Sequence, residues 1–404
     1  MTNAGARNPR IDLLRGISIL LVLFHHFNIG YRLNDTSLAS AFGWEAVRAV
    51  ARNGNYGVTM FFVISGYLIT KNANRRWSGL GNIDARAFYG LRVARIIPCL
   101  LLLLVAVNLL AAAGIAIFQN HAPTGTPVSF WLVNFASVTF WMNVLVGAHG
   151  WVNYPLSVLW SLSVEEVFYL TFPLLCVALR RESRLVAFWC AIIVVGPVYR
   201  FAHQGDEGGF LYAYFASFDA IAIGCCTALL AERIAWHGRS RTLLQCVATT
   251  AMTFVYLYRP IADGNVLGVT AMAIGTAVLL LAADDRPTEP AFRRARVSAV
   301  FGWFGWFGRL SYELYLFHLI VLGLLRTIFP PSSVTGDVKL ALLASYLLLS
   351  AGLSLAIARL YSEPLNRSIR QRLVPGLHVR GNRRPAPEFG ERSRDGSAVP
   401  GPDA

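Results

Sequence analysis

Long apolar segments recur along most of this chain, and they constrain its fold more than any other feature. They alternate with short polar loops from the neighbourhood of Leu13 to that of Tyr361. A helix needs about 20 predominantly apolar residues to cross a bilayer. The chain is 55% hydrophobic and only 14% charged, so its apolar side chains far exceed what the core of a soluble domain requires. The sequence therefore predicts an all-α polytopic membrane protein of the cell (inner or plasma) membrane.

Ten segments are predicted to span the bilayer, and the basic clusters between them indicate their orientation. The predicted spans cover residues 13–29, 56–70, 92–118, 156–179, 185–199, 210–231, 243–258, 266–283, 300–328 and 340–361. Basic residues gather in cytoplasmic loops, so Arg7, Arg10 and the arginines after the last span place both termini in the cytoplasm. Residues 1–372 are expected to form the membrane domain, and residues 373–404, rich in Pro, Gly and Arg, a disordered cytoplasmic tail.

Residues 130–146 form an apolar stretch that is only marginally long enough to span. If this stretch spanned, Arg180, Arg181 and Arg184 would face outward, and the orientation of every later loop would be inverted. If it lies at the interface or re-enters the bilayer, these and all later arginine clusters fall in the cytoplasm. We expect the second arrangement.

The placement of the basic residues and of the cysteines argues against a nucleic-acid surface, disulfides and a metal site. The net charge of +14 falls in short clusters between apolar segments, which is typical of membrane topology and not of a nucleic-acid surface. The six cysteines lie in or beside apolar segments without metal-ligand spacing, so we expect buried, reduced thiols, no disulfide and no metal site. The first span contains Arg15 and precedes no small-residue cleavage site, which predicts a retained helix and not a signal peptide.

The first span carries titratable side chains that an ordinary membrane anchor lacks. His26 follows Arg15 by eleven residues, so on a helix the two differ by about 20° in direction and share one face. His25 points away from that face, and Asp12 lies one turn before Arg15, close enough to pair with it. Ionisable residues inside a bilayer are costly, which indicates a functional site. The alternative is an arginine that extends to the membrane surface and a histidine that ends the helix.

Ionisable residues also interrupt other spans. The adjacent carboxylates Glu165 and Glu166 fall inside the fourth span, where two are hard to explain by packing, so a polar cavity is expected there. Asp219 in the sixth span requires a polar or cationic partner. Arg92 and Arg95 lie one turn apart at the start of the third span, where ordinary flanking charges are the alternative explanation.

Polar residues in two further spans can be explained by a structural role. In the ninth span, Arg309 and Glu313 are four residues apart on a helix, where pairing would neutralise both, and His318 follows. The hydroxyl of Ser65 in the second span has no activating neighbour in sequence, and we expect it to be structural.

Seven short motifs in a fixed order give the chain a resemblance to a known family. In order, they are Arg15 and His26 with ten residues between them, Phe61-Phe62-Val63-Ile64-Ser65-Gly66-Tyr67, Arg92 with Arg95, Trp160-Ser161-Leu162-Ser163-Val164-Glu165, Phe218-Asp219-Ala220, Ser311-Tyr312-Glu313-Leu314-Tyr315-Leu316-Phe317-His318, and Glu363-Pro364. Together they resemble the acyltransferase-3 family of integral-membrane O-acyltransferases over roughly residues 10–370. The resemblance implies ten core spans and transfer of an acyl group, usually acetyl, from acyl-CoA to a hydroxyl of a sugar or other acceptor.

The resemblance also implies roles for residues of this sequence. Arg92 and Arg95 would clamp the phosphates of CoA as paired guanidinium forks at the cytoplasmic face. His26 is then the best general base, because imidazole exchanges a proton near neutral pH, and a covalent acyl-histidine is the open alternative. Arg15 would hold the donor or stabilise developing charge, and Glu165 would orient the imidazole or the acceptor hydroxyl. The supporting residues are Asp12, Glu166, Asp219, Tyr312 and His318.

The expected acceptor is a cell-envelope polysaccharide or its lipid-linked precursor, with a small secreted glycoside such as a macrolide as the alternative. Outside the enzyme class, the alternative is a transporter or exporter, which intramembrane charges suit equally well. A repeated half with broken helices, which would favour transport, is not found in the sequence. The expected partners are acyl-CoA, a hydroxyl-bearing glycan or glycoside and membrane lipid, without nucleic acid. The sequence indicates no oligomeric state.

Two features depart from the family pattern. Some members carry a hydrolase-like domain outside the membrane, whereas charge places the short tail of this chain in the cytoplasm. We therefore expect the membrane domain to complete transfer alone or with a separate partner. Glu313 stands where a small or hydroxyl residue is expected, and the resemblance gives it no role.

Overall fold

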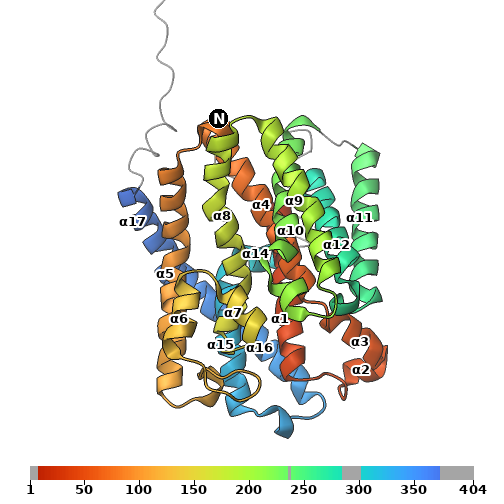
Figure 1. Cartoon of the computed structure of the whole chain (residues 1–404). Helices are drawn as coiled ribbons and strands as arrows, with labels where there is room; N and C mark the ends of the chain where they lie inside the picture. Colours follow the sequence, from red (N-terminus) through yellow and green to blue (C-terminus); the bar gives the residue numbers. More distant parts are fainter. Residues whose placement is uncertain (1–7, 235–237, 284–301, 374–404) are drawn as a thin grey trace, which may run out of the picture.

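The computed structural model describes residues 8–234, 238–283 and 302–373, and within them the chain is helical without a β-strand. Figure 1 shows the long helices side by side in one bundle. The α-helices are α1 (Pro9–Gly30), α2 (Ser37–Phe42), α3 (Trp44–Ala51), α4 (Asn55–Trp77), α5 (Ala85–Ala112), α6 (Phe130–Val138), α7 (Met142–His149), α8 (Leu159–Leu179), α9 (Glu182–Ala202), α10 (Tyr214–Arg233), α11 (Gly238–Tyr258), α12 (Ile261–Ala283), α14 (Gly302–Arg309), α15 (Ser311–Ile328), α16 (Val338–Ile357) and α17 (Glu363–Leu373). Single turns of other helix types are η1 (Leu80–Asn82), η2 (Ala116–Phe118), η3 (Leu156–Val158), η4 (Gly208–Tyr212), η5 (Pro331–Ser333) and η6 (Ala358–Ser362).

Eight stretches of the described residues are long and apolar enough to cross a membrane. They are Pro9–Gly30, Ala85–Ala112, Leu156–Leu179, Glu182–Ala202, Gly208–Arg233, Ile261–Ala283, Ser311–Ile328 and Val338–Leu373. The prediction of an all-α polytopic membrane protein is confirmed. The other two predicted spans form the continuous helices α4 and α11, of 23 and 21 residues. Because those two helices carry more polar side chains, the count of ten spans and the cytoplasmic location of both termini stay predictions.

The prediction that residues 130–146 do not span is confirmed. They fold into the two short helices α6 and α7, of nine and eight residues. The break lies at Phe140, whose φ of 58° is in the left-handed region that a continuous helix cannot contain. At a rise of about 1.5 Å per residue, neither helix is long enough to cross a bilayer.

The predicted ninth span is divided into two helices, which its apolar pattern did not indicate. Residues 302–328 form α14 and α15, and residues 300 and 301 lie outside the described part of the chain. Leu310 separates the two helices with φ of −93° and ψ of 2°, a conformation that ends α14. The prediction of one unbroken span at this position is therefore wrong.

α14 packs closely against α1. A Cβ atom on Gly308 would lie 1.8 Å from the carbonyl oxygen of Asp12, and one on Gly16 would lie 1.9 Å from that of Phe304. The two helices therefore meet backbone to backbone, which only glycine allows at these two positions.

Glycines also allow close backbone contact between α4 and α10 at the centre of the bundle. A Cβ atom on Gly66 would lie 2.0 Å from the carbonyl oxygen of Ile221, and one on Gly224 would lie 2.1 Å from that of Val63. Small residues at such crossings are typical of helix packing in membranes. α4 also contacts α1 and α12, so it is surrounded by other helices along most of its length.

The helix of the last predicted span continues beyond the end of its apolar stretch. α16 passes through the π-helical turn η6 into α17, which packs beside α5 at one end of the bundle (Figure 1). Leu373 is the last residue of α17, and residues 374–404 lie outside the described part of the chain. The boundary at residue 372 and the disordered tail stay predictions.

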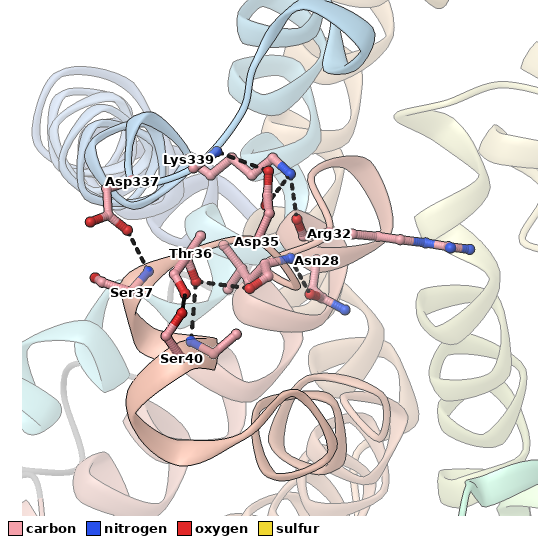
Figure 2. A network of polar contacts seen from close by, with 11 residues as sticks. Asn28, Arg32, Asp35, Thr36, Ser37, Ser40, Asp337 and Lys339 are labelled. Carbon is pink, nitrogen blue, oxygen red and sulfur yellow. Dashed lines mark hydrogen bonds and ion pairs between the residues drawn. The ribbon is translucent and has the colours of Figure 1, made fainter.

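A polar network at the opposite end of the bundle ties the loop after α1 to the loop before α16 (Figure 2). Lys339 donates hydrogen bonds to the carboxylate of Asp35 at 2.5 Å and to the carbonyl oxygen of Arg32 at 2.9 Å. Asp35 also accepts a bond from the backbone N–H of Gly336 at 2.9 Å. The hydrogen bond from Lys339 is the main cause that lowers the pKa of Asp35 from its ordinary value.

All six cysteines are free thiols. Burial was predicted for all of them and holds for Cys99, Cys176 and Cys225, whereas Cys190 and Cys246 are exposed. The two exposed residues lie on α9 and α11, and cysteine is apolar enough to face lipid there.

Candidate functional site

A cavity of about 360 Å³ with many charged side chains lies between α1, α4, α5, α8, α15 and α17. Its polar lining residues are Arg15, Ser65, Asn72, Arg76, Arg92, Arg95, Ser161, Glu165, Glu166, Tyr169, Ser311, Tyr312, Tyr315, Asn366 and Arg370. Five of these are arginines and two are glutamates, so the cavity is cationic inside a largely apolar bundle. The predicted site residues that it brings together are Arg15, Arg92, Arg95, Glu165, Glu166 and Tyr312.

Arg92 is held from two sides at the wall of this cavity. Its guanidinium donates a 2.8 Å hydrogen bond to the buried carboxylate of Glu166, and it lies 3.7 Å from the centre of the Tyr169 ring. The Tyr169 hydroxyl in turn forms a hydrogen bond with the Ser65 hydroxyl on α4. The Nε of Arg92 is buried and has no hydrogen-bond partner among the described residues. A buried N–H of a charged group without a hydrogen-bond acceptor costs free energy, so this position favours an anionic ligand that would accept the bond.

Arg95 and Arg15 add cationic charge to the same cavity. Arg95 is exposed, and its guanidinium lies 5.8 Å from the centre of the Tyr312 ring, whose hydroxyl donates a 3.3 Å bond to the Ile96 carbonyl oxygen. Arg15 reaches the cavity from α1, and Asp12 is buried one turn earlier on that helix. Direct pairing between Asp12 and Arg15 stays a prediction.

The two adjacent histidines of α1 face different neighbours. His26 lies 5.0 Å from His318 of α15 and 5.8 Å from Trp151, measured between ring centres. His25 instead forms a 2.8 Å bond with the carbonyl oxygen of Ala51, at the end of α3. The two rings lie 5.5 Å apart between their centres, and of the two only His26 also has His318 as a ring neighbour.

Backbone carbonyls fix which nitrogen of each paired imidazole is available for proton transfer. The Nδ1 of His26 lies 2.9 Å from the Val22 carbonyl oxygen, and the Nδ1 of His318 lies 3.0 and 2.9 Å from those of Leu314 and Tyr315. A carbonyl oxygen can only accept, so each Nδ1 must carry the proton. In the neutral rings, the basic lone pair is therefore on Nε2 of both histidines, and the Nε2 of His318 is buried without a hydrogen-bond partner in the described residues.

Tyr315 separates this histidine pair from the cationic cavity. Its ring lines the cavity and lies 6.0 Å from the His318 ring, and its hydroxyl contacts the Ser161 hydroxyl at 2.6 Å. Phe61 also lies beside Tyr315, with 6.3 Å between ring centres. His26 is not among the cavity-lining residues, so Arg15 faces the cavity and His26 does not.

Asp219 lies outside the cavity, in a buried polar network. Arg200 of α9 donates a 2.7 Å bond to the Asp219 carboxylate, and both side chains are fully buried. The same guanidinium donates to the Thr270 hydroxyl of α12 at 2.7 Å and to the carbonyl oxygen of Ala216. The predicted cationic partner of Asp219 is therefore Arg200, and the pair joins three helices.

The family of the chain follows from a comparison with known sequence families. The family model described as "Acyltransferase domain" (acyltransferase-3) matches residues 8–360. The chain belongs to the acyltransferase-3 family. The match includes the helices that contribute Arg15, His26, Arg92, Glu165 and His318.

Several curated relatives of this acyltransferase are named O-acetyltransferases. A Bacillus subtilis (strain 168) protein named "Putative peptidoglycan O-acetyltransferase YrhL" is 27% identical over 236 residues, which cover 55% of this chain and 33% of that protein. A Staphylococcus aureus (strain COL) protein named "Putative O-acetyltransferase SACOL0978" is 27% identical over 232 residues, 55% of this chain and 34% of that protein. Listeria monocytogenes "Peptidoglycan O-acetyltransferase OatA" is 29% identical over 168 residues, 41% of this chain and 23% of that protein. The chain thus spans about a third or less of the length of these relatives, and no solved structure matches it.

The structure adds residues to the acyltransferase cavity that sequence reasoning missed. Ser65 was expected to be structural, yet it lines the cavity and contacts Tyr169. Tyr169 follows Glu165 by four residues, so helical spacing could have placed both on one face. Glu313, in contrast, is buried and accepts a 2.8 Å bond from Ser362 of η6, which ties α15 to the end of α16 and leaves the predicted pairing with Arg309 untested.

Proposed function

We propose that this protein moves an acyl group, preferentially acetyl, from acyl-CoA to a hydroxyl of a cell-envelope polysaccharide or its lipid-linked precursor. The observation that carries the proposal is the cationic cavity, where five arginines from four helices surround two carboxylates inside a membrane bundle. Placing so much charge among apolar helices is costly, and a multiply charged substrate accounts for it. Membership of an acyltransferase family supports acyl-CoA, which carries several negative charges, as the proposed donor.

Arg92 and Arg95 would bind the donor. CoA carries its negative charge on phosphates, and guanidinium forks bind phosphates through paired hydrogen bonds. Arg92 is already aligned by Glu166 and Tyr169, and its Nε is available to a ligand. Arg95 stands three residues farther along α5 and is exposed in the same cavity. Preorganised donors of this kind lower the cost of ordering side chains on binding.

His26 would be the general base. Its Nε2 would take the proton from the acceptor hydroxyl while the hydroxyl oxygen attacks the thioester carbonyl. The carbon–sulfur bond then breaks, and the proton passes to the departing CoA thiolate, so that the products are an ester and free CoA. Arg15 would stabilise negative charge on the carbonyl oxygen in the transition state. A covalent acyl-histidine formed on the same nitrogen is the alternative order of steps.

The thioester must pass Tyr315 to reach His26. Tyr315 stands between the cavity and the histidines, and its hydroxyl is held by Ser161 and by the Val158 carbonyl oxygen. We propose that this side chain moves when the acyl end of the donor enters. Glu165, which lines the cavity beside Ser161, would orient the acceptor hydroxyl or the imidazole once that path is open.

The acceptor is proposed from the relatives. Two of the three relatives described above are named for O-acetylation of peptidoglycan. A hydroxyl on the glycan of the cell envelope is therefore the first acceptor to test, and a small secreted glycoside is the second.

Mass spectrometry of the producing cells tests this function. Envelope glycans and secreted metabolites are compared between cells with the gene, cells without it, and cells with His26→Ala. The proposal predicts an acetyl ester on the envelope glycan that is lost in both altered strains. Identical acetylation of glycans and metabolites in all three strains would contradict it.

A further inference from the structure

We propose that Arg76 and Arg370 form a second phosphate-binding subsite, which takes the 3′-phosphate of the CoA donor at the mouth of the cavity. The inference rests on the proposed function, because it names the part of the donor that each pair of arginines binds. Arg76 lies near the end of α4 and Arg370 on α17, and both line the same cavity as Arg92 and Arg95.

These two arginines are brought together by parts of the chain that are almost 300 residues apart. They are close enough for the charge of Arg370 to act on Arg76 unfavourably. Neither forms an ion pair within the part of the chain that the structure describes. The two glutamates of the cavity interact with Arg92 instead, so within residues 8–234, 238–283 and 302–373 no ion pair offsets the repulsion between Arg76 and Arg370. A bound dianion would relieve it.

The spacing of the arginines matches the order of groups in CoA. On α4, Arg76 follows Ser65 by eleven residues, which corresponds to about 16 Å along the helix. Ser65 contacts Tyr169, whose ring lies under Arg92, so Arg92 marks the deeper level. In CoA the diphosphate lies between the adenosine 3′-phosphate and the arm that ends in the thiol. With the thioester directed inward, the diphosphate lies at Arg92 and Arg95, and the 3′-phosphate lies at the mouth.

An aromatic ring beside the subsite favours a nucleotide over inorganic phosphate. Trp77 lines the cavity, is only half-buried, and lies 5.7 Å from the guanidinium of Arg76. A flat apolar face next to a cation suits an adenine that carries a phosphate on its ribose. The alternative explanation is that both arginines are ordinary basic residues that flank the membrane.

Binding of CoA and of 3′-dephospho-CoA to the purified full-length protein in lipid nanodiscs separates these explanations. The unaltered protein is expected to bind CoA more tightly than 3′-dephospho-CoA by about tenfold or more, since bonds between charged groups are strong. Arg76→Gln and Arg370→Gln should each reduce that ratio, mainly by weakening CoA. Arg92→Gln should weaken both ligands in similar proportion and keep the ratio.

Arg75→Gln is the matched control, because Arg75 is exposed on the same turn of α4 and does not line the cavity. It should keep the ratio of the unaltered protein. A ratio is independent of how much of each preparation is folded, so a less stable variant still gives an interpretable result. Equal affinity of the unaltered protein for the two ligands, or an unchanged ratio in Arg76→Gln and Arg370→Gln, would overturn the subsite. Failure of the unaltered protein to bind either ligand would instead overturn the proposed function.

Discussion

At the scale of single residues, the proposed mechanism depends on which imidazole faces the reacting groups. His26 has His318 and Trp151 as ring neighbours, whereas His25 is bound to the end of α3. Both histidines use Nδ1 to donate to a backbone carbonyl, which leaves Nε2 as the basic atom. Position on the helix, and not intrinsic chemistry, therefore distinguishes them.

Replacing each histidine in turn tests this assignment. His26→Ala should lower the rate of acyl transfer by about 10²–10⁴, the usual contribution of a general base. Binding of acyl-CoA should be retained, because His26 lies outside the cavity that holds the arginines. His25→Ala is the control and should keep a substantial part of the activity. Labelled acetyl transfer measures both; a normal rate in His26→Ala, or loss of activity only in His25→Ala, would contradict the assignment.

The sequence predicted individual site residues better than it predicted their contacts. Helical spacing placed Arg15 and His26 on one face and turned His25 away, because those angles depend only on the local helix. It could not show that Tyr315 separates Arg15 from His26, since this side chain comes from a helix far along the chain. It likewise could not pair Asp219 with Arg200, a contact that requires the packing of α9 against α10.

At the scale of helices, glycines allow close contact between helices that carry site residues and their neighbours. α1 and α14 touch through Gly16 and Gly308, one residue from Arg15 and one from Arg309. The apolar pattern predicted a single span at 300–328 because hydropathy does not record such backbone contacts. The division into α14 and α15 lies at Leu310, whose backbone conformation interrupts the helix.

Alanine at these glycines should separate α1 from α14. In Gly16→Ala the new Cβ would meet the Phe304 carbonyl oxygen, so we expect a loss of about 1–3 kcal/mol or more in stability. Gly352→Ala on α16 is the matched control, since a Cβ there meets no atom within 4 Å, and its stability should be unchanged or slightly raised. Thermal unfolding in detergent compares the two. Equal stability of both variants would show that the close contact is not required.

At the scale of the whole molecule, the cavity and the histidine pair lie one after the other along the axis of the bundle. The cavity mouth is formed by the end of α4 and by α17, at the end of the bundle that is predicted to be cytoplasmic. α1 continues from Arg15 at the cavity to His26, about 16 Å farther along its axis. Under the proposed function, a donor from the cytoplasm and an acceptor from the other side would meet inside the protein once Tyr315 has moved. Hydropathy and basic clusters predicted the fold class, whereas the place of Tyr315 between the cavity and the histidine pair required the structure.

The most direct test of acyl transfer uses the purified protein in lipid vesicles, with labelled acetyl-CoA and an envelope glycan as acceptor. Free CoA and the acetyl ester are measured together. The account predicts that both appear in equal amounts, only when the hydroxyl acceptor is present, and not with His26→Ala. Absence of labelled ester with the unaltered protein, or passage of the glycan across the vesicle membrane without acetylation, would contradict it and would favour a transporter.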